Sequence, residues 1–340
     1  MKGAMGKKKG KKLGKKKYWM GIDLGGTKML AGVFKKDFKL IGTVKAKVQP
    51  AEGEKVFLKT LKETVLRVLD ENKISLSQVA GIGAGCPGIM DTEKGRVEVS
   101  PNIPFLKNYP LAKTLSKMLG GVPVVLSNDV NAGLYGEQQF GAAHGHQNVV
   151  GIFLGTGIGG ALIFGGKLYE GSGGGAGEIG HMQMEPNGPQ CGCGQRGCLE
   201  ALAGRVAIAA EAAVLASKQK SPHLFSAVGT DISKIKSGVL AKAIAAGDKA
   251  LLQLIEQKSK LLGIAMANLV NVLNPELIVL GGGLIEALSG VILPASEKSM
   301  RHQAMPDLAK DVKVAAAKLG DHAIIQGAAK MALDYNQGEL

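Results

Sequence analysis

Three cysteines and a histidine lie close together near the middle of the chain. His181 is followed by Cys191, Cys193 and Cys198, which gives the spacing H-x9-C-x-C-x4-C. One imidazole and three thiolates form a ligand set that tetrahedral structural zinc prefers. Glycines at 192, 194 and 197 let a short loop curl around one point, which three thiols without a metal would not require. We therefore expect a zinc-bound loop over residues 181–198, whereas Cys86 stands apart and is expected to be buried and inert.

Two short glycine loops could bind phosphate. The first is Gly25-Gly26-Thr27-Lys28, directly after Asp23-Leu24, and the second begins with Gly155-Thr156-Gly157 within residues 155–160. Glycine has no Cβ, so backbone N–H groups there can approach phosphate oxygens closely. Each loop alone could be a tight hairpin turn. Their duplication, the acidic Asp23 and the triple glycine Gly281-Gly282-Gly283 favour a polyphosphate ligand.

The usual nucleotide fingerprints do not fit these loops. The sequence contains no G-x-x-x-x-G-K-[ST], and the glycines at 25 and 155 lead into apolar runs typical of strands, not into helices. A P-loop or Rossmann nucleotide site is therefore not expected.

A carboxylate follows another apolar strand. Val122 to Leu126 leads into Ser127-Asn128-Asp129-Val130-Asn131-Ala132, which places Asp129 where open α/β sheets present their ligands. Phosphoryl transfer to an alcohol needs a carboxylate within reach of the hydroxyl, because the oxygen loses its proton as it attacks. The alternative is an Asx turn or helix cap before Ala132. The neighbouring phosphate loops favour Asp129 as the catalytic base.

The elements that must position these groups repeat one design. A strand, a glycine loop and a second strand occur early and again near the middle, and the chain beyond residue 200 is largely helical. The predicted strands are Tyr18–Asp23, Met29–Phe34, Leu40–Val48, Val79–Gly85, Val149–Leu154, Ala161–Phe164 and Glu276–Leu280. The predicted helices are Glu54–Asn72, Ala201–Lys218, Val239–Asn274 with a break at Gly247-Asp248, and Ala323–Asp334.

Composition narrows the class of protein. The chain has 340 residues, 45% of them hydrophobic, which is enough for two domains with their own cores. No apolar run suits a membrane span or a signal peptide, so we expect a cytoplasmic protein without a membrane partner. Nine of its fourteen net positive charges come from lysines within residues 1–17. We expect a disordered, solvated tail there, with a weak polyanion-binding arm as the alternative, and no nucleic-acid partner.

The first loop, from Asp23 to Lys28, resembles the first phosphate motif of the actin, hexokinase and Hsp70 superfamily. This resemblance implies an α/β, two-domain actin-like ATPase fold of the ribonuclease H-like type, with a central cleft. It also implies that Asp23 assists Mg²⁺, that Gly25, Gly26, Thr27 and Lys28 contact phosphates, and that Gly155, Thr156 and Gly157 form the second phosphate loop. Gly281, Gly282 and Gly283 would lie by the adenosine of ATP.

A narrower resemblance rests on Glu178-Ile179-Gly180-His181 and on the run from Cys191 to Glu200. These residues look like the signature of the ROK family, and the likeness extends from about Tyr18 to the end of the chain. In ROK sugar kinases such residues contact the sugar, which implies that role for Glu178, His181 and Glu200, with Asn102 and Asn128 beside the base Asp129. The likeness implies an ATP-dependent hexokinase, a structural zinc and a homodimer.

With this fold we expect an N-terminal α/β domain over residues 18–130, joined by the C-terminal helix of about 321–340. A C-terminal α/β domain over 131–320 would carry the zinc loop.

The sugar is less closely specified. Many glucose-phosphorylating members have a tryptophan soon after the sugar-binding asparagine, whereas Asn102 is followed by Ile103-Pro104-Phe105 and the single tryptophan is Trp19. Glucose is the expected substrate because Glu178, His181 and Glu200 are all present, and N-acetylmannosamine, fructose and mannose are the alternatives. Polyphosphate could replace ATP as the donor. A sugar-responsive regulator without enzyme activity is a further alternative, which the presence of Asp129 disfavours.

Overall fold

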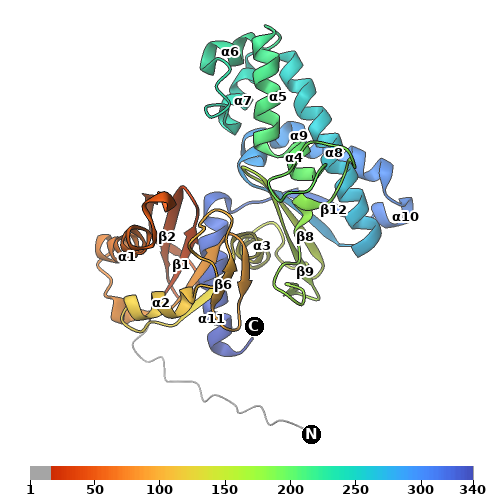
Figure 1. The fold of residues 1–340 in the computed structure, drawn as a ribbon. Helices are drawn as coiled ribbons and strands as arrows, with labels where there is room; N and C mark the ends of the chain where they lie inside the picture. Colours follow the sequence, from red (N-terminus) through yellow and green to blue (C-terminus); the bar gives the residue numbers. More distant parts are fainter. Residues whose placement is uncertain (1–16, 340) are drawn as a thin grey trace. The chain divides into compact units, whose positions relative to one another are not determined.

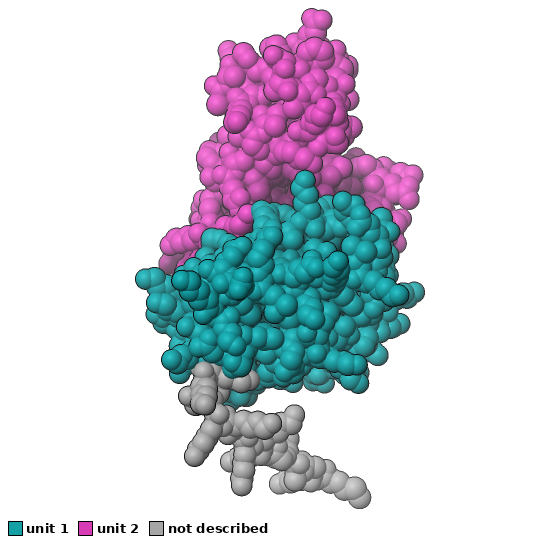
Figure 2. Space-filling model, turned by 90° about the vertical axis from the view of Figure 1, so that its left-hand side faces the viewer, with its two compact units in different colours: residues 1–136, 322–340 teal, residues 137–321 magenta. Residues whose placement is uncertain are grey.

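The computed structural model describes residues 17–339 (Figure 1). Except for Lys17, the predicted lysine-rich tail lies outside these residues. The chain divides into two compact units, coloured separately in Figure 2. Unit 1 runs to Gly136 and includes the segment from His322, and unit 2 is Glu137–Asp321. No helix among the described residues is long and apolar enough to cross a membrane.

The sheet of unit 1 has the strand order β3-β2-β1-β4-β7. Its strands are β1 (Tyr18–Leu24), β2 (Lys28–Phe34), β3 (Leu40–Lys47), β4 (Val79–Cys86) and β7 (Val124–Asn128). The first three form the antiparallel meander that the sequence predicts, and β4 and β7 run parallel to β1. A separate hairpin consists of β5 (Ile89–Asp91) and β6 (Arg96–Val99).

Helices cover both faces of this sheet. On one face α1 (Glu54–Glu71) and α2 (Leu111–Met118) share a core with Met20 and Ile22 of β1. On the other face lies α11 (Ala323–Gln337), the blue helix beside β1 in Figure 1. This helix packs so closely on the strands that residue 83 has no room for a side chain. A Cβ at Gly83 would lie 1.8 Å from the Ala328 carbonyl oxygen. Two single turns, η1 (Pro50–Glu52) and η2 (Leu76–Gln78), flank α1, and η4 (Gly320–His322) precedes α11.

The sheet of unit 2 has the order β10-β9-β8-β11-β12. Its strands are β8 (Val149–Leu154), β9 (Ile158–Phe164), β10 (Lys167–Leu168), β11 (Leu277–Gly281) and β12 (Lys313–Ala316). The second glycine loop is shorter than the predicted 155–160. Ile158, Gly159 and Gly160 already pair with Leu154, Phe153 and Ile152, so only residues 155–157 form the turn.

Apart from the largely irregular segment 169–198, the rest of unit 2 is mainly helical. The helices are α3 (Asp129–Phe140), which continues from unit 1, α4 (Leu199–Ala203), α5 (Arg205–Ser217), α6 (Pro222–Val228), α7 (Ser237–Ala245), α8 (Lys249–Leu273), α9 (Gly283–Gln303) and α10 (Pro306–Ala309), with the turn η3 (Ile179–His181). The break at Gly247-Asp248 is confirmed. The single helix predicted over Ala201–Lys218 is wrong, because Gly204 adopts an extended conformation with φ −66° and ψ 159° and separates α4 from α5.

One buried carboxylate ties together the two ends of unit 2. Glu137 has no exposed surface, and its side chain accepts hydrogen bonds from the backbone N–H groups of Ala142, Lys318 and Leu319 at 2.7, 2.9 and 2.8 Å. These bonds satisfy a charge that would otherwise be costly to bury. They also hold the segment that leaves the unit beside the helix that enters it.

Candidate functional site

The carboxyl ends of three parallel strands of unit 1 lie side by side. In the strand register Asp23 pairs with Gly85, and Cys86 pairs with Asn128. Burial, followed by the negative charges of Asp129 and Asp23, raises the pKa of the Cys86 thiol. Both carboxylates therefore act on the same edge of the sheet. Cys86 itself is buried, as the sequence predicts.

The first glycine turn joins β1 to β2 at this edge. The Gly25 N–H donates to the Lys28 carbonyl over 3.0 Å, and the Thr27 carbonyl accepts from the Val48 N–H at 2.9 Å. Thr27 and Lys28 are exposed. A Cβ at Gly26 would lie 2.9 Å from the Asn102 carbonyl oxygen, so the turn and Asn102 are neighbours only because residue 26 has no side chain.

Asn128 and Asp129 differ in how their side chains are used. The Asn128 Oδ1 accepts the N–H groups of Val130 and Asn131 at 2.8 and 3.1 Å, and its amide donates to the Gly88 carbonyl at 3.1 Å. Asn128 is thus the side chain that caps α3, the role considered for Asp129 as the alternative to catalysis. Asp129 is partly buried, and its Oδ1 accepts the Val130 N–H at 3.0 Å.

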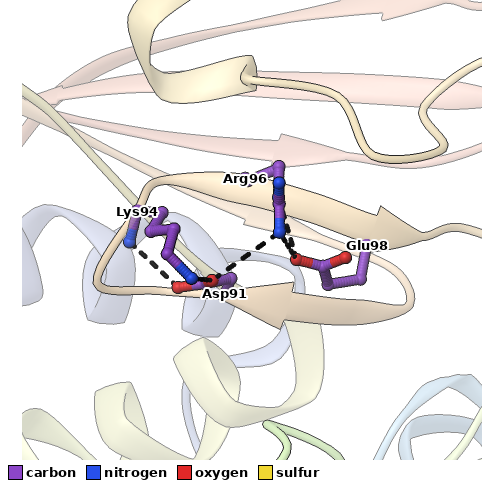
Figure 3. A network of polar contacts seen from close by, with 4 residues as sticks. All are labelled: Asp91, Lys94, Arg96 and Glu98. Atoms are coloured by element: carbon purple, nitrogen blue, oxygen red, sulfur yellow. Dashed lines mark hydrogen bonds and ion pairs between the residues drawn. The ribbon is translucent and has the colours of Figure 1, made fainter.

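The hairpin of β5 and β6 lies in the chain between Gly88, which Asn128 contacts, and Asn102. Four charged residues hold this hairpin together (Figure 3). Lys94 Nζ lies 2.7 Å from an Asp91 oxygen, and the Arg96 guanidinium donates twice to one oxygen of Glu98. Hydrogen bonds from Lys94 lower the pKa of Asp91. Arg96 also lies 4.0 Å from Asp91, so the network links the two strands of the hairpin, and the exposed turn residue Asn102 follows three residues after β6.

The second glycine turn lies between β8 and β9 of unit 2. The Gly155 N–H donates to the Gly157 carbonyl over 2.9 Å, and Thr156 is exposed at the tip. The triple glycine lies against the same strand end. Gly282 has φ +85°, and a Cβ there would lie 2.6 Å from the Leu154 carbonyl oxygen. Two of the predicted phosphate and nucleotide segments are therefore adjacent within unit 2.

The four predicted metal ligands converge in unit 2. One side-chain ligand atom from each of His181, Cys191, Cys193 and Cys198 lies within 4.8 Å of the other three. The Cys193 and Cys198 sulfurs are 3.7 Å apart, and the Cys191 sulfur is 3.6 Å from His181 Nδ1. Tetrahedral zinc with ordinary bond lengths would separate two sulfurs by about 3.8 Å, and a sulfur and a nitrogen by about 3.6 Å. The geometry and chemistry of this group fit such a metal.

The surroundings of the cluster support that use. His181 Nε2 lies 3.8 Å from a Glu178 oxygen, so the nitrogen that does not face the thiols faces a carboxylate, an arrangement that orients metal-binding imidazoles. A hydrogen bond from the Gln195 backbone N–H lowers the pKa of Cys193, whereas burial raises the pKa of Cys191 and Cys198. Metal binding at such a site releases protons, since thiolate is the ligand. Of the three flanking glycines, Gly194 and Gly197 have positive φ.

Glu200 connects the cluster to the glycine turn. Its Oε2 accepts the Ile158 N–H at 2.9 Å, and its Oε1 lies 3.8 Å from the Cys191 sulfur. A Cβ at Gly157 would lie 1.8 Å from Oε2, so this carboxylate occupies the space that a side chain at 157 would take. Glu200, which is predicted to bind the sugar, is therefore also a hydrogen-bond acceptor for the strand that follows the turn.

One residue beside the turn was not predicted. Arg205 donates from Nη2 to the Thr156 hydroxyl over 3.1 Å. In the sequence Arg205 is marked only by the preceding Gly204 and by its place five residues after Glu200, and this signal is too weak to single it out. Among the predicted residues, unit 1 brings together Asp23, the first turn, Asn102, Asn128 and Asp129. Unit 2 brings together the second turn, the triple glycine, Glu178, Glu200 and the four metal ligands.

Two sheets of the same order, each with a glycine turn between its first two strands, define a two-domain α/β protein of the actin-like ATPase class. Within that class, residues 19–335 match the model of the ROK family, and the chain belongs to this family.

Three relatives illustrate its range. The glucokinase of Thermotoga maritima is 36% identical over 312 residues, which are 92% of this chain and 96% of that protein. The crystal structure of a ROK family glucokinase from Streptomyces griseus in complex with glucose and AMPPNP matches with a TM-score of 0.82 at 30% identity, covering 93% of this chain and 99% of that chain. The xylose repressor of Bacillus subtilis is 30% identical over 255 residues, 75% of this chain but 61% of the repressor.

Proposed function

We propose that the protein is an ATP-dependent glucokinase that transfers the terminal phosphoryl group of ATP to a hydroxyl of glucose. The observation that carries the proposal is the pair of equivalent glycine turns together with Asp129 at the carboxyl edge of the first sheet. The similarity to a glucokinase that binds glucose and AMPPNP supports the choice of sugar and donor.

Asp129 acts as the general base in this proposal. It accepts the proton of the attacking hydroxyl while a bond forms between that oxygen and the terminal phosphorus, and the bond to the leaving ADP breaks. Asn128 positions Asp129, because its side chain caps the helix that begins with the base. One N–H of its amide remains for a sugar oxygen.

The remaining site residues divide into two sets. The first set binds sugar hydroxyls and consists of Asn102, Glu178, His181 and Glu200. A sugar that lacks a hydroxyl for one of these side chains would leave that side chain unpaired and would bind more weakly. The second set binds the donor. Gly25, Gly26, Thr27, Lys28, Gly155, Thr156 and Gly157 bind the phosphates, and Gly281, Gly282 and Gly283 lie at the adenosine.

Two metals complete the proposal. Asp23 supplies the hard oxygen donor that suits Mg²⁺, which neutralises phosphate charge when bound with ATP. His181, Cys191, Cys193 and Cys198 hold zinc, and four protein ligands leave zinc no open position for chemistry. Its task is structural, because the loop of residues 181–198 begins at His181 and is flanked by Glu178 and Glu200.

A coupled assay of ADP release over glucose, mannose, fructose, N-acetylmannosamine and N-acetylglucosamine tests the proposal. We expect the highest kcat/KM with glucose. A higher value with another sugar would reassign the substrate within the same mechanism. Turnover with polyphosphate but not with ATP would change the donor.

A sugar-responsive regulator is the second candidate, because a xylose repressor aligns with three quarters of the chain. It predicts sugar binding without ADP release on any member of the panel. Turnover of glucose excludes this candidate as the sole function.

The organisation of the molecule is part of the proposal. We assign residues 18–130 with about 321–340 to one domain and 131–320 to the other, and we expect a homodimer in the cytoplasm. Size-exclusion chromatography with light scattering measures the oligomeric state.

A further inference from the structure

The first turn of α5 holds the second glycine turn. Arg205 is the first residue of this helix, and its Nη2 donates to the Thr156 hydroxyl at 3.1 Å. The next residue, Val206, donates its backbone N–H to the Thr156 carbonyl at 3.4 Å. This arrangement depends on the break at Gly204, which starts a new helix at Arg205. A guanidinium therefore lies at the tip of the turn.

The charge of Arg205 is not neutralised by the protein. Among residues 17–339, no carboxylate forms an ion pair with it, and the Oε2 of Glu200 accepts the Ile158 N–H. A guanidinium has five N–H donors in a fixed fork that matches phosphate oxygens. The Thr156 hydroxyl accepts one of them, so the others remain for a ligand.

The turn also has room for an anion. Thr156 is exposed, and a Cβ added at Gly155 would meet no atom within 4 Å. A positive side chain and a hydroxyl thus lie on an exposed turn that has open space beside Gly155. This combination suits the phosphate group of a nucleotide better than its base or ribose.

We propose that Arg205 binds a terminal phosphate of the nucleotide donor together with Thr156. The inference rests on the proposed kinase function and adds a residue to its donor site. It assigns Arg205 a direct contact with the ligand, not only a role in holding α5 against the turn.

The test compares Arg205→Ala and Arg205→Lys with the wild-type protein. Isothermal titration calorimetry measures binding of AMPPNP with Mg²⁺, of adenosine and of glucose. We expect Arg205→Ala to weaken AMPPNP binding by roughly 10- to 100-fold, because it removes a charge-assisted hydrogen bond. Arg205→Lys should restore part of that loss, since it keeps the charge but not the fork. Adenosine and glucose should bind to all three proteins with the same affinity.

Arg67→Ala is the control, because Arg67 is an exposed arginine of unit 1 that donates to the Lys45 carbonyl and pairs with Glu71. It should bind AMPPNP like the wild-type protein. In kinetics, Arg205→Ala should raise the KM for ATP and leave the KM for glucose unchanged.

Two results would overturn the inference while leaving the kinase proposal intact. One is unchanged AMPPNP affinity in Arg205→Ala with normal turnover. The other is an equal loss of AMPPNP and adenosine affinity together with a lower Tm, which would mean that Arg205 only supports the fold. Failure of the kinase proposal appears separately, as a wild-type protein that binds no AMPPNP or phosphorylates no sugar.

Discussion

The two sheets of the molecule share one plan and carry different chemistry. Each has a β-meander or hairpin on one side and two parallel strands on the other, in the orders β3-β2-β1-β4-β7 and β10-β9-β8-β11-β12. Each places a glycine turn after its central strand, closed by the N–H of Gly25 in one and of Gly155 in the other. The shared strand order therefore places a glycine turn at the equivalent position of both sheets.

The differences lie in what surrounds the turns. In unit 1 the last strand ends at Asn128 and leads into Asp129, whereas in unit 2 the corresponding strand β12 ends at Ala316 without a carboxylate at the next position. Unit 2 instead carries Glu200 and the cluster of His181, Cys191, Cys193 and Cys198, which could hold a metal, beside its turn. The comparison teaches that a repeated backbone can be specialised through its loops, with the proposed base on one copy and the proposed zinc ligands on the other.

The largest expected effect concerns Asp129, which has no counterpart after β12 in unit 2. Asp129→Asn should lower kcat by roughly 10²- to 10⁴-fold, because the amide cannot accept the hydroxyl proton. Glucose affinity and metal content should stay nearly unchanged. Asp70→Asn, at an exposed position of α1, is the control for this substitution. If Asp129→Asn keeps wild-type turnover in the coupled assay, another group is the base.

Loss of the proposed zinc should affect only the unit that carries the Cys and His cluster. Cys193→Ser should reduce bound zinc, measured by mass spectrometry, from one ion per chain to about none, and it should lower Tm because metal binding contributes to folding. Cys86→Ala is the matched control, since Cys86 belongs to unit 1 and lies outside the cluster. Loss of zinc in the control as well would contradict this location of the metal.

Alanine substitutions should affect stability differently at the two glycines of the second turn, Gly155 and Gly157. Gly157→Ala should cost about 1–3 kcal/mol of unfolding free energy, because its Cβ displaces the Glu200 carboxylate and leaves the Ile158 N–H without its partner. Gly155→Ala should change stability by less than about 0.5 kcal/mol, since open space surrounds that position. Urea unfolding measures both, and equal values would show that Glu200 moves aside freely.

The smallest expected effect concerns the amino-terminal ends of β1 and β8, opposite the ends that lead into the glycine turns. Lys17 donates its N–H to the neutral Gln78 carbonyl at the start of β1, whereas before β8 the N–H groups of Gln147 and Asn148 donate to the Glu276 carboxylate. These bonds lower the pKa of Glu276 below 4.5. Its contribution is therefore present above pH 4.5 and is lost as the pH falls through the lower, folded-state value.

Glu276→Gln measures that contribution. The exposed site limits it to about 1 kcal/mol or less at pH 7. The difference from the wild-type protein should shrink in urea unfolding as the pH falls below 4.5. A difference that stays constant with pH would mean that the charge of Glu276 does not matter.

Much of this architecture could be predicted because local patterns dominate it. The predicted strands, the glycine turns and the spacing of the Cys and His residues depend on near neighbours in the sequence, and the structure places them close to their predicted bounds. The short strands β5, β6, β10 and β12 were not predicted. The break at Gly204 was missed because the alanine-rich helical pattern continues across it. Arg205 and the use of Asn128 as a cap were missed for a different reason. Both depend on contacts of an ordinary polar side chain with atoms that only the fold brings near.

Glu137 has a consequence for protein engineering. Its carboxylate holds residues 318 and 319 beside the start of unit 2, so the entry and exit of this unit are neighbours. Unit 2 is in effect an insertion within unit 1, with its two ends closed by one side chain. A short linker between residues 136 and 322 should therefore bridge the gap left by deleting unit 2, and a short linker between residues 137 and 321 should allow unit 2 itself to be circularly permuted.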